Sequence, residues 1–362
     1  MKPTTSQTLP GNSKGFSLIE LMVSVVIGMI GVIVMMQVFS NAESQKRTTT
    51  GAGDAQSNGA MAIYALQRDI RQGGHGFNSL SALACPLEIP TVAHTLSQLA
   101  PVIINPPVAD VPAGDANTDT LLVTYGSAEG STEGDSFSVS GSSILEVANI
   151  ASYKTDNRII TAPSAPTIGC ALKLTKIVST LGNAVTVTPS SGATSDGTLF
   201  NLGSTPKILA YAVRNGNLTV CDYTVKNCST VGADRWIPIV NNIVSLRAEY
   251  GHDITPPPAT YPYNTWNQTT PAQPSPPNQE AFACLWAKTK AIRIAVVARN
   301  SAFSKDAVTD TAPTWEGSTT TPPHPTPIPI DLSAKADWKN YRYKLIETVI
   351  PMRNLPWMAL CP

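Results

Sequence analysis

A chain of 362 residues is long enough to bury a hydrophobic core of its own and to form one or two globular units. Its formal net charge is zero and only 14% of its residues are charged, so it lacks the extended basic surface that binds nucleic-acid backbones. The 30 prolines and 24 glycines favour short strands joined by long polar connections, which predicts a mostly β structure outside any helical terminus.

The N-terminus divides into a polar leader, residues 1–15, and an apolar run from Phe16 to Phe39. At about 1.5 Å per residue, a helix formed by this run exceeds the roughly 30 Å hydrocarbon core of a bilayer. Lys2 and Lys14 favour a cytoplasmic leader, so the rest of the chain is expected on the periplasmic side of an inner membrane. No small-residue cleavage site follows Phe39, which places any processing before the apolar run.

Glu20 is an acidic residue inside this apolar run, where a carboxylate is costly unless it has a partner. If cleavage after Gly15 frees the amine of Phe16, then Glu20 of one subunit can pair with that amine on a neighbour and neutralise both charges. The alternative is that Glu20 lies near the membrane surface and extends its carboxylate to water. Both interpretations keep the helix as an anchor.

The stretch from Gly15 to Glu20, Gly-Phe-Ser-Leu-Ile-Glu, followed by the apolar run, resembles the processing and methylation signal of type IV prepilins and type II secretion pseudopilins. The resemblance implies that a membrane peptidase cuts after Gly15 and methylates Phe16, and that Glu20 serves in assembly. The implied partners are other major and minor pilins, the prepilin peptidase and the inner-membrane assembly machinery.

One helix is predicted from Phe16 to Gln72, ended by Gly73 and Gly74. This segment departs from many major pilins because it contains no proline, so a proline kink is not expected, although Gly28 and Gly31 could loosen it locally. Three further glycines are expected to weaken the helix, namely Gly51, Gly53 and Gly59.

The second half of this helix is amphipathic, because Ile63, Leu66 and Ile70 recur at helical spacing on one side. We expect the charged residues between them to be solvated or locally paired, namely Arg68, Asp69 and Arg71. Residues 66–77 resemble the helix end of PilW-type minor pilins and of J-type minor pseudopilins.

Beyond Phe77 the chain consists of short β-branched or alternating runs that predict strands. These runs are 120–125, 144–147, 172–178, 184–187, 208–213, 218–221, 239–250, 291–298 and 341–350. Asn215-Gly216 predicts a hairpin turn, since both positions of a type I′ turn need a positive φ. Two proline-rich stretches, 256–277 and 313–329, are predicted to be exposed loops. The PilW-type pattern is also resembled by three later segments of the sequence, residues 242–251, 292–299 and 348–354.

Six cysteines follow the apolar run, which suits structural disulfides in an oxidising compartment. Six cysteines allow fifteen pairings, and the sequence favours only Cys221 with Cys228, which enclose a short polar loop. No Cys-x-x-Cys pair occurs, so thiol-redox chemistry and zinc binding are not expected.

Catalytic and metal-binding motifs are nearly lacking. Residues 11–15 formally match Gly-x-Ser-x-Gly, but they lie in the polar leader with no strand before them. The histidines are scattered, at positions 75, 94, 252 and 324. A loop with Asp110, Asp115 and Asp119 misses the calcium-loop spacing, and a solvated acidic loop is the expectation. We therefore expect no enzyme activity, no cofactor and no metal.

The predicted fold class is α+β, with a long N-terminal hydrophobic and amphipathic helix packed on a mostly antiparallel β-sheet domain with long proline-rich loops. The expected organisation is a cleaved leader (1–15), a transmembrane and assembly helix (16–39), its amphipathic second half (40–77) and an exported β-rich domain (78–362), with a subdivision near residue 254 left open. Two classes of function remain open. One is a minor pilin that primes or caps a type IV pilus, with a J-type role in secretion as its variant. The other is a displayed adhesive or DNA-capturing head whose exposed face includes Trp266 and Trp286.

Overall fold

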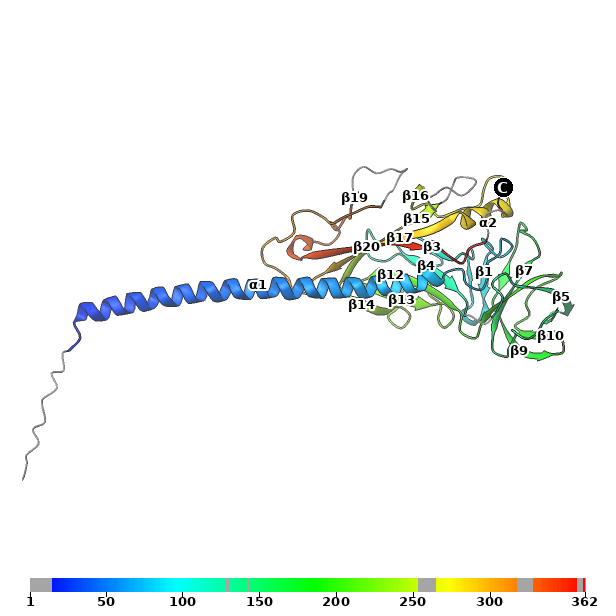
Figure 1. The fold of residues 1–362 in the computed structure, drawn as a ribbon, viewed down its shortest axis with the longest axis horizontal. Helices are drawn as coiled ribbons and strands as arrows, with labels where there is room; N and C mark the ends of the chain where they lie inside the picture. The colour runs from blue at the N-terminus through cyan, green and yellow to red at the C-terminus, as the bar shows by residue number, and fades with distance from the viewer. Residues whose placement is uncertain are drawn as a thin grey trace, which may run out of the picture. The chain divides into compact units, whose positions relative to one another are not determined.

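A computed structural model describes residues 15–127, 130–141, 143–252, 265–317, 328–356 and 361. The chain divides into two compact units, Met1–Thr50 and Gly51–Pro362. Helix α1, Leu18–Gln72, is continuous, begins in the first unit and ends in the second (Figure 1). The predicted helix is therefore confirmed, with its C-terminal end at the expected residue.

A five-stranded antiparallel sheet forms the middle of the second unit, in the order β14-β13-β12-β4-β3. Its strands are β3 (Val102–Ile104), β4 (Leu121–Tyr125), β12 (Lys207–Arg214), β13 (Asn217–Asp222) and β14 (Ile237–Asn241). The β12–β13 turn is the predicted one, because Asn215 and Gly216 have φ of 51° and 70°. All three residues of β3 are buried, so this edge of the sheet is covered.

A four-stranded antiparallel sheet follows in the order β16-β15-β17-β20. Its strands are β15 (Ile243–His252), β16 (Thr265–Asn267), β17 (Thr289–Arg299) and β20 (Tyr343–Pro351). The single run predicted over 239–250 is two strands, since Asn242 takes a φ of 57° between β14 and β15. A short helix that we did not predict, α2 (Gln279–Ala287), precedes β17, and the Asn278 side chain accepts a hydrogen bond from the Ala281 N–H at 2.9 Å.

A closed six-stranded barrel occupies the connection between β4 and β12. Its strand order is β10-β6-β5-β11-β7-β9, and the strands are β5 (Asp135–Gly141), β6 (Ile144–Val147), β7 (Arg158–Pro163), β9 (Thr175–Leu181), β10 (Ala184–Thr188) and β11 (Gly197–Gly203). The labelled barrel strands lie together beyond the C-terminal end of α1 (Figure 1). The sequence predicted three of these strands but not the barrel.

Two small sheets and two 3₁₀ turns complete the described part of the chain. They comprise β1 (Leu87–Ile89), β2 (His94–Leu96), β8 (Leu172–Lys173), β18 (Thr314–Trp315), β19 (Ile328–Pro329), η1 (Pro90–Val92) and η2 (Trp338–Asn340). Strand β1 pairs antiparallel with β2 and parallel with β8. Every other strand pairing in the described ranges is antiparallel, so the predicted fold class is confirmed.

Three hydrophobic clusters stabilise the second unit. The largest joins the end of α1 to the inner faces of the five-stranded and four-stranded sheets. The barrel has its own cluster, which includes Phe137, Ile159 and Leu199. A third cluster on the four-stranded sheet includes Val297, Trp315 and Ile330. The barrel therefore folds around its own core.

Candidate functional site

The candidate functional site begins where the chain enters α1. Gly15, Phe16 and Ser17 have no regular secondary structure, and the Ser17 carbonyl accepts the first helical bond from the Leu21 N–H at 3.1 Å. The Phe16 side chain is 82% exposed. The Gly15–Phe16 peptide bond thus lies in accessible backbone just before the helix, as a peptidase requires.

Glu20 lies in the first turn of α1 with its side chain exposed. A carboxylate at this end of a helix is favoured by the helix dipole and by the free N–H groups of the first turn. The Ser24 hydroxyl donates to the Glu20 carbonyl at 2.7 Å, and within the described part of the chain no residue pairs with the Glu20 carboxylate. The carboxylate is therefore available to a group outside this chain.

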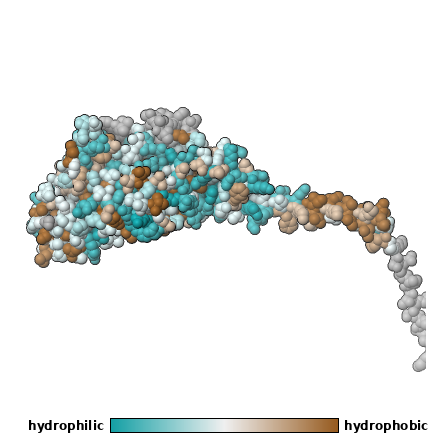
Figure 2. All heavy atoms as spheres, turned by 180° about the vertical axis from the view of Figure 1, so that it is seen from behind, coloured by the Kyte–Doolittle hydropathy of each residue, from teal (hydrophilic) through white to brown (hydrophobic). Residues whose placement is uncertain are grey.

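The segment of α1 after Glu20 presents apolar side chains on all sides. Its valine, leucine, isoleucine, methionine and phenylalanine residues up to Phe39 are exposed, and Figure 2 shows this part of the helix as hydrophobic. Among the described residues, α1 is the helix long and apolar enough to cross a membrane. It continues without interruption through Gly28 and Gly31, so the loosening considered for these glycines does not break it.

Within the second unit, the buried stripe of α1 begins with small residues. Gly51, Ala55, Gly59 and Ala62 recur every three to four residues and are all buried. A Cβ atom on Gly59 would lie 2.7 Å from Cδ1 of Ile346 on β20. The expectation that these glycines only weaken the helix was incomplete, because Gly51 and Gly59 allow its close approach to the sheet.

The stripe then continues with large apolar residues and one acid, Asp69, which is fully buried. Tyr125 of β4 donates to Asp69 Oδ1 at 3.0 Å, and Tyr211 of β12 donates to Oδ2. The Arg68 guanidinium donates to both oxygens, at 2.9 and 3.2 Å, from a more exposed position. Burial, and after it the Asp69 charge, raises the pKa of both tyrosines.

The expected local pairing of Asp69 is present, with Arg68, but Asp69 is buried rather than solvated and has two tyrosine partners that we did not predict. Asp69 follows Leu66 by three residues, which places it on the buried face of the helix. That spacing was the available signal, but the two tyrosine partners are 56 and 142 residues away in sequence. A buried carboxylate with several donors fixes the helix against the five-stranded sheet.

The C-terminal end of α1 is capped by a residue from the far end of the chain. The Asn354 amide lies 3.4, 3.2 and 3.4 Å from the carbonyls of Arg71, Gln72 and Gly73. The Gln72 carbonyl also accepts from the His75 N–H at 3.0 Å, so the amide adds to the backbone turn that ends the helix. Gly74 is required beside it, because its φ is 85° and a Cβ atom there would lie 2.3 Å from the Asn354 carbonyl.

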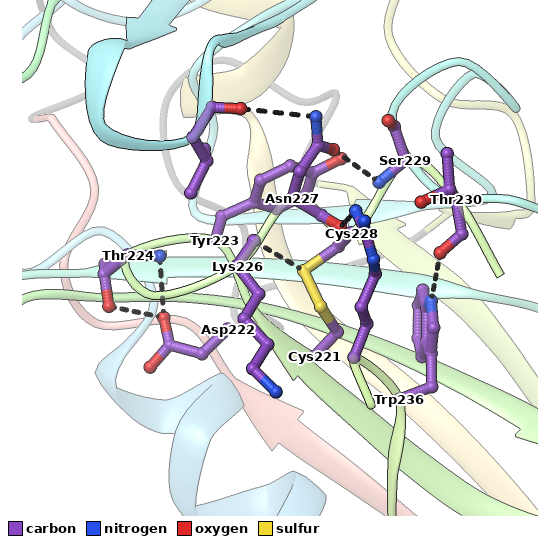
Figure 3. The surroundings of a disulfide bond; sticks show 12 residues. Cys221, Asp222, Tyr223, Thr224, Lys226, Asn227, Cys228, Ser229, Thr230 and Trp236 are labelled. Carbon is purple, nitrogen blue, oxygen red and sulfur yellow. Dashed lines mark hydrogen bonds between the residues drawn. A yellow bond between two sulfur atoms is a disulfide. The ribbon is translucent and has the colours of Figure 1, made fainter. Parts of the chain in front are cut away.

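Three disulfides are present: Cys85–Cys170, Cys221–Cys228 and Cys284–Cys361. The pair that the sequence favoured closes a loop at the end of β13, with an S–S distance of 2.04 Å (Figure 3). The loop is held further by the Arg235 guanidinium, which donates to the Asn227 carbonyl at 3.0 Å. No described cysteine is free, so the disulfides are structural.

The acidic loop is not solvated as expected, because Asp110 and Asp119 are buried. Asp110 accepts from the Ser97 hydroxyl at 2.5 Å, and its other oxygen lies 3.1 Å from His94 Nε2. In a nucleophilic triad the histidine lies between serine and carboxylate. Here Asp110 lies between Ser97 and His94. The three residues therefore connect the loop that carries Asp110 to strand β2 and the residue after it, and they do not activate a nucleophile.

Asp119 contacts the Asn105 amide and the Ala248 N–H, while Asp115 contacts Lys335 at 3.1 Å. Within the described ranges no group of three His, Cys, Asp or Glu side chains could hold a metal ion. Burial lowers the pKa of His252. His324 and Ser13 lie outside the described residues.

The two tryptophans expected on the exposed face of an adhesive head are not fully exposed. Trp286 is 1% exposed and its indole N–H donates to Gln98 at 3.2 Å, so it belongs to the core. Trp266 is partly buried under the Arg293 guanidinium, 4.2 Å from its ring centroid. Residues 256–264 and 318–327 of the proline-rich stretches lie outside the described residues.

Comparison with known proteins gives two family matches. Residues 211–354 match the model described as type IV pilus-assembly protein W, and residues 10–36 match the prokaryotic N-terminal methylation motif. One similar solved structure is the type IV-like pilin TTHA1219 from Thermus thermophilus, with 13% identity and a TM-score of 0.21 over 56% of this chain and 87% of that one. No curated protein matches the chain.

Proposed function

We propose, from the premise that this chain is a type IV pilin-like protein with a PilW region and an N-terminal methylation motif, that it is a minor pilin of a type IV pilus. It acts by association and not by catalysis, priming or capping the fibre together with other pilins. The observation that carries this proposal is the continuous apolar helix, exposed on all sides and interrupted by one acid.

The N-terminal segment has two roles in this proposal. Residues 1–15 form a cytoplasmic leader that prepilin peptidase removes after Gly15, and the new amine of Phe16 is methylated. Residues 16–39 then anchor the protein in the inner membrane, residues 40–77 continue the helix, and residues 78–362 lie in the periplasm before reaching the pilus at the cell surface. The assembly machinery of the inner membrane extracts the helix into the fibre.

Glu20 has the central part in assembly. Its carboxylate has no partner among the described residues and lies four residues after Phe16. In a bundle of apolar helices, pairing with the Phe16 amine of a neighbouring subunit removes the cost of two separate charges. The register between neighbouring helices is thereby fixed.

The experiment combines N-terminal mass spectrometry on native membranes with detection of the protein in the sheared pilus fraction. We expect wild type to begin at methylated Phe16 and to enter the fraction, and Glu20→Ala to be lost from it. The matched control is Glu43→Ala, which removes an exposed carboxylate of the same helix beyond the apolar run. An unprocessed start at Met1, or normal incorporation of Glu20→Ala, would contradict the proposal.

A J-type role in type II secretion is the variant of this proposal. The match of residues 211–354 to the pilus-assembly protein favours the pilus. Deletion of the major pilin gene in the same strain separates the two: the pilus role predicts that the chain disappears from the sheared fraction with the major pilin while secretion is unchanged.

A further inference from the structure

The barrel is an addition to an otherwise complete sheet. Strands β4 and β12 pair directly, with Tyr125 opposite Lys207, and the whole barrel lies in the connection between them. It also lies between the two stretches that match known families, residues 10–36 and 211–354. Neither the anchoring of α1 to the five-stranded sheet nor the family matches account for it.

A groove of about 280 Å³ opens at one end of this barrel. Its floor is formed by Phe137 of β5 and Thr161 of β7, and its walls by the loops that contain Thr167 and Thr194. Phe137 belongs to the barrel core, so the groove is the mouth of the barrel. Barrel mouths are a common place for small-ligand sites.

The lining of the groove is polar without charge. Its polar side chains are the hydroxyls of Thr161, Thr167, Thr194 and Ser195, and none of its lining residues is ionisable. Thr161 is only 6% exposed as a residue, but its hydroxyl is open to the groove and makes no hydrogen bond within the described part of the chain. A hydroxyl that faces the groove can donate to and accept from a bound ligand.

We propose that this groove binds a neutral sugar unit of a glycan. An ionic ligand would lose its hydration without gaining a counter-charge, and a wholly apolar ligand would remove water from the hydroxyls of Thr161, Thr194 and Ser195 without replacing its hydrogen bonds. Sugar hydroxyls both donate and accept, as the lining hydroxyls do. The carbon face of the ring can contact the apolar atoms of Pro163, Ala171 and Ala193 in the lining. This binding does not depend on assembly into a fibre.

Two glycines provide a way to fill the groove. Gly192 and Gly169 have φ of 75° and 77°, and a Cβ atom on either would meet no atom within 4 Å. Asparagine tolerates this backbone conformation better than other side chains. Gly192→Asn therefore places a side chain in the groove, while Gly182→Asn makes the same change at φ 60° in the β9–β10 turn, away from the lining.

The experiment presents the full chain, purified in a detergent without a sugar head group, to an array of neutral, sialylated and sulfated glycans. The dissociation constant of any neutral glycan bound is then measured by calorimetry. We expect at least a tenfold loss of affinity in Gly192→Asn, a roughly 3- to 10-fold loss in Thr161→Val, where one hydrogen bond is removed, and no change in Gly182→Asn.

Failure of wild type to bind any neutral glycan, binding restricted to charged glycans, or unchanged affinity in Gly192→Asn would each overturn the proposal. Because the protein is tested in detergent solution, these outcomes are independent of processing and of pilus assembly. Thermal unfolding of each variant separates a blocked groove from a misfolded barrel.

Discussion

At the residue scale, Asp69 is the buried polar side chain that joins α1 to the five-stranded sheet. It is fully buried, and its two oxygens accept from tyrosines on adjacent strands, β4 and β12. Removing one partner of a buried polar cluster costs more than the cluster's net contribution, because the remaining donors lose their acceptor without regaining water. Substitution of Asp69 should therefore lower the free energy of unfolding.

Asp69→Asn replaces a carboxylate by an amide and turns one acceptor into a donor that faces a tyrosine hydroxyl. We expect it to lower the free energy of unfolding by about 2–3 kcal/mol, measured by thermal unfolding followed by near-UV circular dichroism in detergent. Asp54→Asn makes the same chemical change at an exposed position of the helix and should change stability by less than about 0.5 kcal/mol. Equal effects of the two variants would show that the cluster does not hold the helix.

The buried tyrosines should also make the stability of the fold depend on pH. Burial raises the pKa of Tyr125, Tyr153, Tyr211 and Tyr223 above the ordinary value of 10.0, and raises that of Tyr343 to about 12. Below pH 10 these groups are neutral in both states and their contribution is fully present. As pH rises through 10, the unfolded chain loses protons that the folded chain keeps, so stability falls.

We therefore expect the contribution of these tyrosines to the free energy of unfolding to stay constant up to about pH 10. Above that pH the free energy of unfolding should fall steeply. The measurement is denaturant unfolding at a series of pH values, with phenolate absorbance recorded in parallel. Phenolate should appear together with unfolding. A full phenolate titration near pH 10 in the folded protein would refute the expectation.

At the scale of the element, α1 combines two surfaces. Its first part is apolar on all sides, and within the second unit it carries a stripe of small residues that permits close packing on β17 and β20. The Cβ position of Gly59 lies 2.7 Å from Ile346 and 3.4 Å from Ala298, so only a residue without a side chain fits there unless Ile346 moves. Gly53, by contrast, is exposed with no atom near it.

The same substitution should therefore have opposite effects at these two glycines. Gly59→Leu forces the helix from the sheet and should destabilise the second unit by about 1–3 kcal/mol. Gly53→Leu should stabilise it by roughly 0.5–1 kcal/mol, because leucine has the higher helix propensity. Chemical unfolding of both variants provides the comparison, and destabilisation by Gly53→Leu would contradict the packing argument.

At the scale of the whole molecule, disulfides join segments that are distant in sequence. Cys85–Cys170 spans 85 residues and connects the segment after α1 to a loop of the barrel, whereas Cys221–Cys228 spans only 7. A cross-link lowers the entropy of the unfolded chain in proportion to the logarithm of the loop it closes. Cys85–Cys170 should therefore contribute more to the free energy of unfolding than Cys221–Cys228.

The loop-entropy relation gives about 4.6 kcal/mol for the 85-residue separation and about 2.4 kcal/mol for the 7-residue one. We expect the double variant Cys85→Ser with Cys170→Ser to be less stable than Cys221→Ser with Cys228→Ser by about 2 kcal/mol. Equilibrium unfolding of both under the same non-reducing conditions measures the difference. Each double variant serves as the control for the other, and the reverse order would contradict the entropic account.

Features that depend on neighbouring residues could be predicted from the amino-acid sequence alone. The apolar run, the end of α1 at Gln72, the turn at Asn215-Gly216 and strands such as Ile144–Val147 follow from local hydropathy, glycine conformation and β-branching. The processing motif is likewise local, so its residues were named from the sequence, and their roles stay predictions.

The contacts between residues that are distant in sequence depend on the folded arrangement of the sheets and could not be predicted. Asp69 accepts from a tyrosine 142 residues away, and Asn354 caps a helix that ended some 280 residues earlier. The closed barrel and two of the disulfides arise in the same way, since strand order and cysteine pairing are set by long-range packing rather than by local propensity. Contacts of this kind leave no periodic pattern in the sequence, because their free energy is realised only once the sheets assemble.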